Sequence, residues 1–340
     1  MHDLIVAGGG PVGLATALYA AQAGLDVVVR EPRGAPVDKA CGEGLMPGAV
    51  ADLTRLGIPL TGIDLAGIRY CDPHRFVDAP FRAGPGRGVR RTTLHSALAE
   101  AAVAAGVVIE PDPVREVEQR ADRVLVDGQA ARHLVAADGL HSPVRRMLGL
   151  EAPRRGQRRF GLRRHLALAP WTSYVEVHWS PRAEAYVTPV APDCVGLAVL
   201  TPEGGDFEDL LRAFPALAER VAGADGTRVL GAGPLRQRVT RRVAGRVLLV
   251  GDASGYVDAL TGEGIALGLA QARAAVAAVV AGSPESYERA WHRLSWRHNL
   301  LTASLLRVSS RPMLRRALVP AADRLPVVFR AAVNQLARPA

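Results

Sequence analysis

A glycine-rich stretch near the N-terminus constrains the fold more than any other part of this chain. An apolar run, Leu4-Ile5-Val6-Ala7, leads directly into Gly8-Gly9-Gly10-Pro11-Val12-Gly13, in which Gly8, Gly10 and Gly13 match the pattern G-x-G-x-x-G. The residues that follow predict a helix from Leu14 to Ala23, ended by Gly24, and then a second apolar strand that ends at Arg30-Glu31. The order strand, tight turn, helix, strand is that of a dinucleotide-binding unit.

Each glycine of this motif has a physical role. The first permits the turn, the second lets backbone N–H groups approach a pyrophosphate, and the third allows the helix to pack closely on the strand. The N-terminus of the helix then faces the phosphates. Glu31 lies 18 residues after Gly13, where an acidic group binds the hydroxyls of an adenosine ribose. The stretch therefore predicts an ADP-containing cofactor, and the alternative is a glycine-rich turn that binds nothing.

Composition limits the partners. A chain of 340 residues with 49% apolar residues predicts two closely joined lobes with a sizeable core. A net charge of +9 is typical of proteins that bind nucleic acid. Here, however, Lys39 is the only lysine, and the excess charge is local, since the segment 285–340 alone holds ten arginines against three acidic residues. Interleaved aromatic residues and zinc-ligand spacings are missing, so we expect no nucleic-acid partner.

The three cysteines indicate a reducing compartment, and the apolar segments indicate no membrane span. Cys41, Cys71 and Cys194 form no C-x-x-C pair, so we expect neither a disulfide framework nor a metal site, and we expect a cytoplasmic protein. The segment 266–282 is too short for a membrane span and carries Gln271 and Arg273, so we expect no transmembrane segment.

The order of patterns along the chain predicts an α/β (α+β) fold with a discontinuous first lobe. A Rossmann-like lobe with a mixed or parallel sheet is expected from 1–66, 86–150 and 236–284. Strand-like runs broken by prolines predict an antiparallel sheet from 67–85 and 151–235, with one helix over 207–222 packed on it. The segment 285–340 is expected to form basic helices with breaks near Pro312 and Pro326.

Four motifs in this order carry a family resemblance. They are the N-terminal unit with Glu31, Arg91 at the head of a helix, Ala137-Asp138-Gly139-Leu140-His141-Ser142 with Arg145, and Gly251-Asp252-Ala253-Ser254-Gly255 with Thr261-Gly262-Glu263-Gly264-Ile265. Together they resemble the FAD-dependent oxidoreductases of the para-hydroxybenzoate hydroxylase fold, over roughly residues 1–282. The loop Lys39-Ala40-Cys41-Gly42-Glu43-Gly44-Leu45 and the Thr-Gly-Glu-Gly-Ile form of the last motif look most like the geranylgeranyl reductase branch.

The resemblance implies FAD as cofactor and NADH or NADPH as electron donor. Asp252 would meet the ribityl and pyrophosphate region, Gly262 to Ile265 would pass beside the flavin ring, and Arg91 would contact the phosphate and ribityl side. Backbone at Val114 would meet the adenine. The full set of expected cofactor-binding residues is Gly8, Gly10, Pro11, Val12, Gly13, Glu31, Cys41, Gly42, Arg91, Val114, Asp138, Gly251, Asp252, Gly262, Gly264 and Ile265.

Several departures narrow the function. The stretch Ala185-Tyr186-Val187-Thr188-Pro189-Val190 lacks the tryptophan and phenylalanine of geranylgeranyl reductases, so a prenyl substrate is not implied. The Trp-x-Trp-x-Ile-Pro run of flavin halogenases is missing, and Cys41-Gly42 stand where the hydroxylases commonly have an arginine. The spacing around Ser254 differs from G-x-S-x-G, which disfavours a serine hydrolase.

Three hypotheses remain open. The first is a reductase, in which a nicotinamide nucleotide reduces FAD and the flavin reduces a carbon–carbon double bond of a small apolar metabolite. The second is a monooxygenase of the same fold, and the third is a nucleotide-binding protein without turnover. Because the flavin itself performs the redox chemistry, the lack of an unambiguous acid–base residue in the sequence does not argue against an enzyme.

Individual residues outside the motifs are less informative. Cys41 is the candidate catalytic residue, with a small apolar filler as its alternative role. His165, His178, Trp179 and Tyr186 lie on the expected substrate sheet, where alternation sends about half of them away from a pocket. The basic C-terminal helices are candidates for peripheral membrane contact, and the alternative is a solvated basic face.

Overall fold

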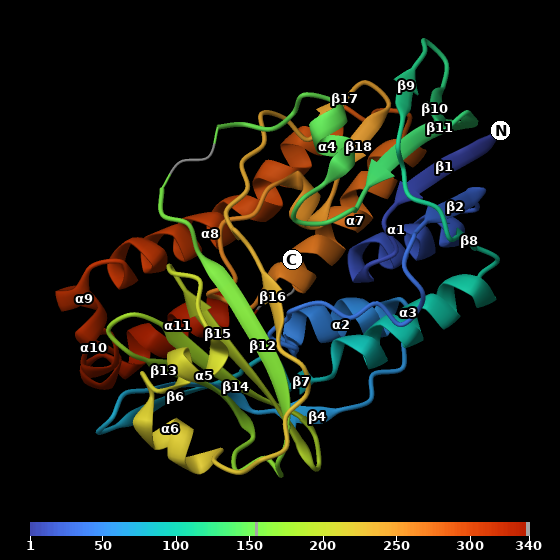
Figure 1. The fold of residues 1–340 in the computed structure, drawn as a ribbon. Coiled ribbons are helices and arrows are strands. Elements are labelled where there is room, and N and C mark those ends of the chain that lie inside the picture. The colour runs from blue at the N-terminus through green and yellow to red at the C-terminus, as the bar shows by residue number, and fades with distance from the viewer. Residues whose placement is uncertain (154–155, 338–340) are drawn as a thin grey trace.

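The computed structural model describes residues 1–153 and 156–337. It contains two large sheets that lie beside each other, with helices packed on both, a small third sheet, and a basic helical segment at the C-terminus (Figure 1). The predicted α/β fold, with its Rossmann-like lobe, its second sheet and its C-terminal helices, is confirmed. Residues 154–155 and 338–340, within the ranges predicted for the second lobe and the C-terminal helices, lie outside the described residues.

The first sheet is built on the N-terminal strand. Its strand order is β17-β18-β11-β1-β2-β8, and β9 and β10 extend it as a meander from β11. The strands β1, β2, β8, β11 and β18 run parallel, while β9, β10 and β17 pair in antiparallel fashion. Residues 4–7 of β1 are all fully buried, as expected for a parallel strand covered on both faces. The strands of this sheet are β1 (His2–Ala7), β2 (Val27–Arg30), β8 (Val108–Glu110), β9 (Val117–Gln119), β10 (Val124–Val126), β11 (Gln129–Ala136), β17 (Val243–Ala244) and β18 (Val247–Leu249).

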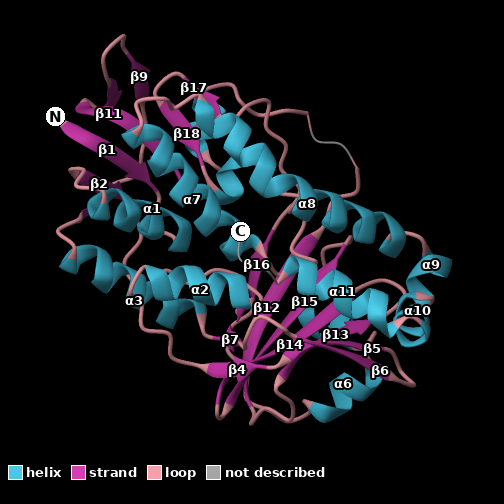
Figure 2. Ribbon diagram, turned by 180° about the vertical axis from the view of Figure 1, so that it is seen from behind, coloured by secondary structure: helices cyan, strands magenta, loops and turns pink. Residues whose placement is uncertain are grey.

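Helices from distant parts of the sequence cover one face of this sheet and share one apolar core (Figure 2). They are α1 (Pro11–Gln22), α2 (Pro47–Arg55), α3 (Arg91–Ala104) and α7 (Gly264–Val280). The short helix α4 (Pro143–Met147) packs at the other face, and the 3-10 turn η1 (Gly251–Ser254) follows β18. The first lobe is thus discontinuous in sequence.

The second sheet has the order β16-β12-β15-β14-β13-β5-β6. Its pairs are antiparallel except for β13 and β5, which run parallel. The strands are β5 (Gly67–Cys71), β6 (Phe76–Pro80), β12 (Phe160–Ala167), β13 (Tyr174–Trp179), β14 (Glu184–Ala191), β15 (Cys194–Thr201) and β16 (Leu230–Ala232).

The single helix predicted over 207–222 is wrong. The structure has two short helices, α5 (Phe207–Leu211) and α6 (Pro215–Arg220), on the outer face of the second sheet. Pro215 has no N–H to donate to the preceding turn, so it ends one helix and begins the next.

A three-stranded sheet joins the two lobes, which the sequence did not indicate. It consists of β3 (Gly44–Leu45), β7 (Gly86–Gly88) and β4 (Ile63–Leu65). A Cβ on Gly88 would lie 1.7 Å from the Pro189 carbonyl oxygen, so this glycine permits direct backbone contact with β14. We propose that the two lobes have the boundaries predicted from the sequence and that this small sheet connects the lobes.

The C-terminal segment forms α8 (Ser286–Ser309), α9 (Pro312–Arg316), α10 (Leu318–Arg324) and α11 (Pro326–Leu336). New helices begin at Pro312 and Pro326, where the sequence predicted breaks. Helix α8 extends from the first lobe to α9, and α10 and α11 pack on the second sheet near β6 (Figure 1). Among the described residues, no helix has both the length and the apolar character needed to cross a membrane.

Candidate cofactor and active site

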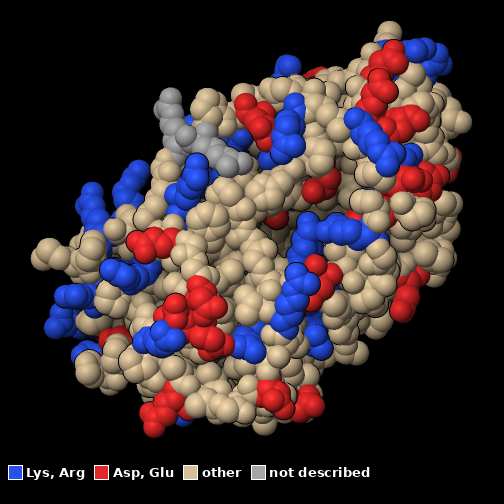
Figure 3. Space-filling view, viewed as in Figure 1, with Lys and Arg blue, Asp and Glu red and all other residues tan. Residues whose placement is uncertain are grey.

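A cavity of about 480 Å³ lies where the two sheets and the C-terminal helices meet. The space-filling view shows a hollow in the middle of the molecule's face, with basic side chains beside it (Figure 3). Its volume is in the range of small-molecule sites. Predicted cofactor-binding residues that line it are Gly10, Pro11, Val12, Cys41, Gly42, Arg91, Asp138, Gly251, Asp252, Gly262, Gly264 and Ile265.

The glycine-rich turn brings the N-terminus of α1 to this cavity. Gly8 has a φ of +97°, and a Cβ on Gly13 would lie 1.8 Å from the Gly8 carbonyl oxygen, so both positions require glycine. Gly10 precedes the helix in an extended conformation and no side chain caps the helix there. Because the first N–H groups of a helix have no partner within it, this end of α1 can bind an anion.

Glu31 lies beneath the glycine-rich turn rather than on the cavity wall. Its carboxylate accepts hydrogen bonds from Gly9 N–H at 2.8 Å and from Arg33 Nε and Nη2 at 2.7 Å each. Burial alone would raise the pKa of Glu31, but the hydrogen bonds from Arg33 and Gly9 outweigh it and hold the pKa below its usual value. The carboxylate is therefore ionised, and its contact with a ribose stays a prediction.

A second helix N-terminus, that of α7, also opens on the cavity. Gly264 and Ile265 line the cavity at its first turn, and Gly262 has a φ of +70°. Glu263 does not cap the helix, since its side chain accepts a hydrogen bond from His298 at 2.7 Å. Two helix N-termini without side-chain caps therefore face one cavity.

Two aspartates and a buried arginine connect the third and fourth motifs. Burial raises the pKa of Asp252, an effect that Lys39, Arg91 and Arg145 partly offset, and burial also raises the pKa of Asp138. Arg145 donates to the Leu140 carbonyl at 2.9 Å and to the Ala253 carbonyl at 3.0 Å. Arg145 thereby holds the two cavity-lining turns together.

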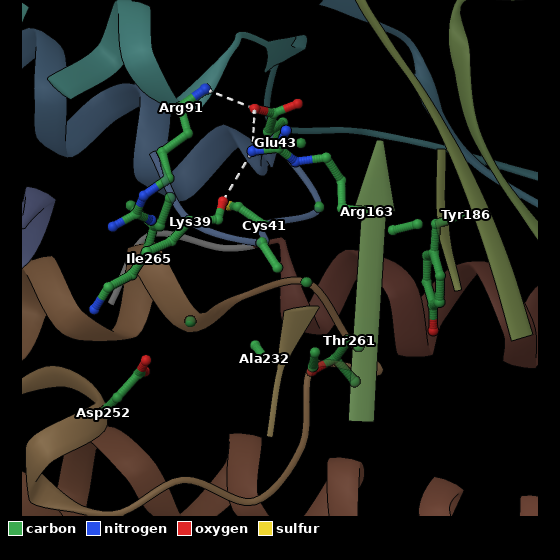
Figure 4. Close-up of a pocket in the computed structure, with 18 of the residues that line it drawn as sticks. Lys39, Cys41, Glu43, Arg91, Arg163, Tyr186, Ala232, Asp252, Thr261 and Ile265 are labelled. Carbon is green, nitrogen blue, oxygen red and sulfur yellow. Dashed lines mark hydrogen bonds and ion pairs between the residues drawn. The ribbon is translucent and has the colours of Figure 1, made fainter. Parts of the chain in front are cut away.

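The loop that carries Cys41 is fastened to the second sheet. Thr188 on β14 donates to the Gly42 carbonyl at 2.8 Å, and Arg163 on β12 donates to the Lys39 carbonyl at 3.0 Å and pairs with Asp38. In the close-up, Cys41 lies in the middle of the cavity between the Lys39 side and the Tyr186 side (Figure 4).

Glu43 and His165 form the centre of this attachment, a role that the sequence did not reveal. It placed Glu43 only in the Cys41 loop and His165 only on the substrate sheet. Glu43 accepts a hydrogen bond from the Arg91 N–H at 2.8 Å (Figure 4). It also accepts one from His165 Nε2 at 2.6 Å. Since Arg163 donates to Nδ1 of His165 at 3.1 Å, we assign that histidine as neutral with its proton on Nε2. Glu43 thus connects the Cys41 loop, the first turn of α3 and the second sheet.

A further residue that the sequence did not reveal is His95. Its Nε2 lies 2.9 Å from the Gly9 carbonyl oxygen and donates to it, so α3 is tied to the glycine-rich turn. Burial lowers the pKa of His95, which keeps it neutral. Its position one helical turn after Arg91 was the available signal, but nothing in the sequence linked it to Gly9.

The remaining predicted residues do not line the cavity. Gly8 and Gly13 shape the turn from behind, and Val114 packs, partly buried, against the core cluster that contains Ile5 and Leu134. A contact between Val114 and adenine stays a prediction.

The other end of the cavity is apolar. Side chains from the second sheet, strand β4, the loop after β6 and the C-terminal helices line it, including Leu65, Ile68, Phe81, Val175, Val177, Leu200, Leu305, Val333 and Leu336. Tyr186 borders this chamber, and its hydroxyl donates to the Leu260 carbonyl at 3.0 Å. Trp179 instead packs edge-on against Tyr70.

His178 faces away from the cavity and belongs to a polar group on the outer side of the second sheet. Ligand atoms of Cys71, Glu176 and His178 lie within 4.8 Å of one another. The Glu176 carboxylate already accepts hydrogen bonds from Trp171 and His178 and lies 3.6 Å from the Arg69 guanidinium. We therefore interpret this group as a hydrogen-bonded network on the sheet surface.

The cavity residues fit FAD. Two helix N-termini offer backbone N–H groups to phosphate and to the flavin ring, and Arg91 has a buried Nε without a hydrogen-bond partner among the described residues. An apolar chamber adjoins this polar end. Fold and site together define a flavoprotein of the dinucleotide-binding type.

Comparisons with known proteins agree. The chain belongs to the FAD-binding domain family, whose model matches residues 1–283. It is 30% identical to a menaquinone reductase of Mycolicibacterium smegmatis over 87% of this chain and 80% of that protein. It is 28% identical to digeranylgeranylglycerophospholipid reductase 1 of Methanothermobacter thermautotrophicus, over 78% of this chain and 74% of that protein.

Solved structures share the fold at lower identity. The flavin-dependent brominase Bmp2 superposes with a TM-score of 0.84 at 18% identity, covering 99% of this chain and 93% of that one. The predicted membership of the para-hydroxybenzoate hydroxylase fold superfamily, close to the geranylgeranyl reductases, is confirmed. The protein is an FAD-dependent oxidoreductase.

Proposed function

We propose that this enzyme is a reductase that takes electrons from NADH or NADPH and saturates a carbon–carbon double bond in an apolar molecule. The observation that carries the proposal is the junction at Cys41, where a polar cofactor end of the cavity meets a chamber lined by aliphatic side chains. Menaquinone and isoprenoid-lipid reductases among the relatives support the same reaction class.

The proposed division of labour follows from the residues. Gly10 to Val12 and Gly264 to Ile265, with Arg91 and Asp252, hold FAD, which supplies hydride transfer when bound. Glu43, His165 and Thr188 fix the Cys41 loop at the mouth of the chamber. Cys41 gives its thiol proton to one carbon of the double bond while the other carbon receives the hydride, and solvent restores the thiol.

The experiment that tests the reaction class is an anaerobic half-reaction. The enzyme is reduced with nicotinamide nucleotide, mixed with unsaturated lipids such as a menaquinone, and followed at the visible flavin band. A carbon–carbon double-bond reductase reoxidises without oxygen and yields a product that stays heavier by two hydrogens after any quinol has been oxidised back to the quinone. A product that returns to the starting mass shows reduction of the quinone ring instead. If the flavin instead stays reduced until oxygen is admitted, and the product gains an oxygen atom, the enzyme is the alternative, a monooxygenase.

Cys41→Ser tests the proton donor separately. A serine hydroxyl is a far weaker acid, so we expect turnover to fall by about a hundredfold or more while flavin reduction by nicotinamide nucleotide persists. Cys194→Ser, on a strand of the second sheet outside the cavity lining, is the matched control. Unchanged turnover in Cys41→Ser would show that this cysteine only fills space.

We further propose that the enzyme meets its substrate at an anionic membrane surface. The segment from α9 to α11 exposes Met313, Leu314, Leu325, Val327 and Val328, and the exposed Arg311, Arg316 and Arg324 lie among them. Arginine among exposed aliphatic residues suits the headgroup region of anionic lipid. On the same helix α11, Val333 and Leu336 line the chamber.

Liposome sedimentation tests the membrane contact. We expect salt-sensitive binding to vesicles with anionic lipid and weak binding to neutral vesicles, and a Val327→Asp, Val328→Asp variant should remain in the supernatant. Equal sedimentation of the variant and the unaltered chain would contradict this surface.

A further inference from the structure

Lys39, the only lysine among the 340 residues, places its ammonium in the cofactor end of the cavity. Its Nζ lies 3.3 Å from the position that a Cβ would occupy on Gly139, so it reaches across to the turn of the third motif. In the close-up, the side chain points to the same side as the Arg91 guanidinium and Asp252 (Figure 4). The structure thus directs the one primary amine of a side chain into the cavity.

The backbone of Lys39 is held while its ammonium is free of partners. Arg163 binds the Lys39 carbonyl at 3.0 Å and fixes where the side chain starts. The ammonium forms no hydrogen bond or ion pair within the part of the chain that the structure describes. A cation fixed at its base and unpaired at its end suits an anionic ligand.

The charges around it point to the same ligand. Burial lowers the pKa of Lys39, and Arg33 and Arg91 lower it further, while Asp252 and Glu31 act in the opposite direction. Arg33 is engaged by Glu31, but Arg91 has no side-chain hydrogen bond among the described residues. Two uncommitted cations therefore stand beside the uncapped N-terminus of α1.

We propose that the Lys39 ammonium binds the pyrophosphate of FAD, closing the 38–44 loop over the phosphates opposite the N-terminus of α1. A pyrophosphate diester carries two negative charges, which Lys39 and Arg91 would balance. This inference deepens the proposed cofactor site and is independent of whether the reaction is a reduction or an oxygenation.

The single lysine makes the contact measurable by chemistry other than turnover. The unaltered chain is treated with an amine-selective acetylating reagent, without ligand and with saturating FAD, ADP or riboflavin, and the rates at Lys39 and at the Met1 amine are read by mass spectrometry. We expect FAD and ADP to slow acetylation of Lys39 severalfold, because a bound anion blocks the amine and raises its pKa. The exposed Met1 amine should react at one rate throughout.

Substitutions separate contact from mere burial. Lys39→Met should weaken FAD binding about tenfold, as expected for a hydrogen bond to a charged group, and the difference should narrow as salt rises. Lys39→Arg should restore most of the affinity. Arg289→Met removes an exposed cation on α8 away from the cavity and should leave FAD affinity unchanged.

The outcomes distinguish failure of the proposed FAD site from failure of the Lys39 contact alone. A chain that binds no FAD would overturn the proposed cofactor site together with this inference. Tight FAD binding with equal acetylation of Lys39, or with full affinity in Lys39→Met, would overturn the Lys39 contact alone. Protection by riboflavin but not by ADP would move the contact from the pyrophosphate to the flavin half.

Discussion

At the scale of single residues, Glu31 is a buried acid whose charge and orientation are set by its hydrogen bonds. Its carboxylate is shared between Gly9 N–H and the Arg33 guanidinium, and these hydrogen bonds keep it ionised in spite of its burial. An ionised and oriented carboxylate is the acceptor that ribose hydroxyls need.

Glu31→Ala should therefore weaken FAD binding by about 1.5–3 kcal/mol, or roughly ten- to a hundredfold in Kd. Titration of the apoprotein by quenching of flavin fluorescence measures this loss. Glu31→Gln keeps an acceptor for Gly9 N–H and should lose less. Glu100→Ala, on the exposed side of α3, is the control, and an unchanged Kd in Glu31→Ala would remove Glu31 from the site.

Asp252 provides a prediction for pH. Burial raises its pKa above the value of about 4 that it has in an unfolded chain, so the folded apoprotein binds this proton more tightly. Its ionisation therefore costs stability as pH rises from about 4 through the raised pKa. Asp252→Asn should make the apoprotein more stable than the unaltered chain above that window, with no difference below pH 4, while FAD binding weakens.

Urea unfolding of both apoproteins across this pH range is the measurement. A variant that is less stable than the unaltered chain at neutral pH would contradict this expectation. It would show that the attraction of Lys39 and Arg91 for the Asp252 carboxylate stabilises the fold by more than the burial of that carboxylate costs.

The sequence revealed those residues that belong to local patterns and missed those that act across the chain. Gly8, Gly10, Gly13 and Asp252 could be predicted because turn geometry and spacing mark them. Glu43 and His165 are 122 positions apart and meet only because β12 packs against the Cys41 loop. No local period or cap records such a contact.

At the scale of elements, the close approach of α1 to β1 sets the position of the backbone N–H groups that we propose bind phosphate. A Cβ on Gly13 would lie 1.8 Å from the Gly8 carbonyl oxygen, a backbone atom that cannot turn aside. Helix α1 must therefore shift if an α-hydrogen of Gly13 is replaced by a methyl group.

Gly13→Ala should destabilise the protein by roughly 1–3 kcal/mol, as overpacking does, and should abolish FAD retention. Thermal unfolding and the flavin content of the purified protein measure the two effects. Gly204→Ala, where a Cβ would meet nothing within 4 Å, should change neither. Normal flavin content in Gly13→Ala would show that the turn can relax.

Elements with strong local signals were predicted well, and those decided by tertiary contacts were not. The parallel core strands and the breaks at Pro312 and Pro326 follow from apolar runs and from proline chemistry. The division of 207–222 into two helices at Pro215 also follows from proline chemistry, although one helix was expected there. The sheet of β3, β4 and β7 could not be predicted, since its strands have only two or three residues each.

At the scale of the whole molecule, a buried charge network attaches the C-terminal helices to both lobes. Arg315 on α9 pairs with Glu184 at 2.8 Å, and Arg159 pairs with Glu184 at 2.8 Å and with Asp258 at 2.9 Å. Asp258 lies in the turn between the fourth motif's two halves. The network thus connects α9 with the segment that leads to the N-terminus of α7.

Arg315→Met should cost about 3 kcal/mol, the low end for breaking a buried pair, because Arg159 still neutralises Glu184. We expect faster limited proteolysis beyond α8 and weaker binding of apolar substrates, since Val333 and Leu336 line the chamber. The neighbouring exposed Arg316→Met is the control. Equal proteolysis of the two variants would show that apolar packing alone holds these helices.

The discontinuity of the first lobe has a consequence for how the protein is made on the ribosome. β11 pairs with β1 on one side, and residues 134–136 pair on the other side with β18, whose residues are translated more than a hundred codons later. During that interval the nascent chain presents an open strand edge, and a glycine-rich turn that lacks the N-terminus of α7 opposite it. On the proposed cofactor site, both helix N-termini can hold FAD only after residue 265 has emerged, so we expect cofactor binding to come late in synthesis.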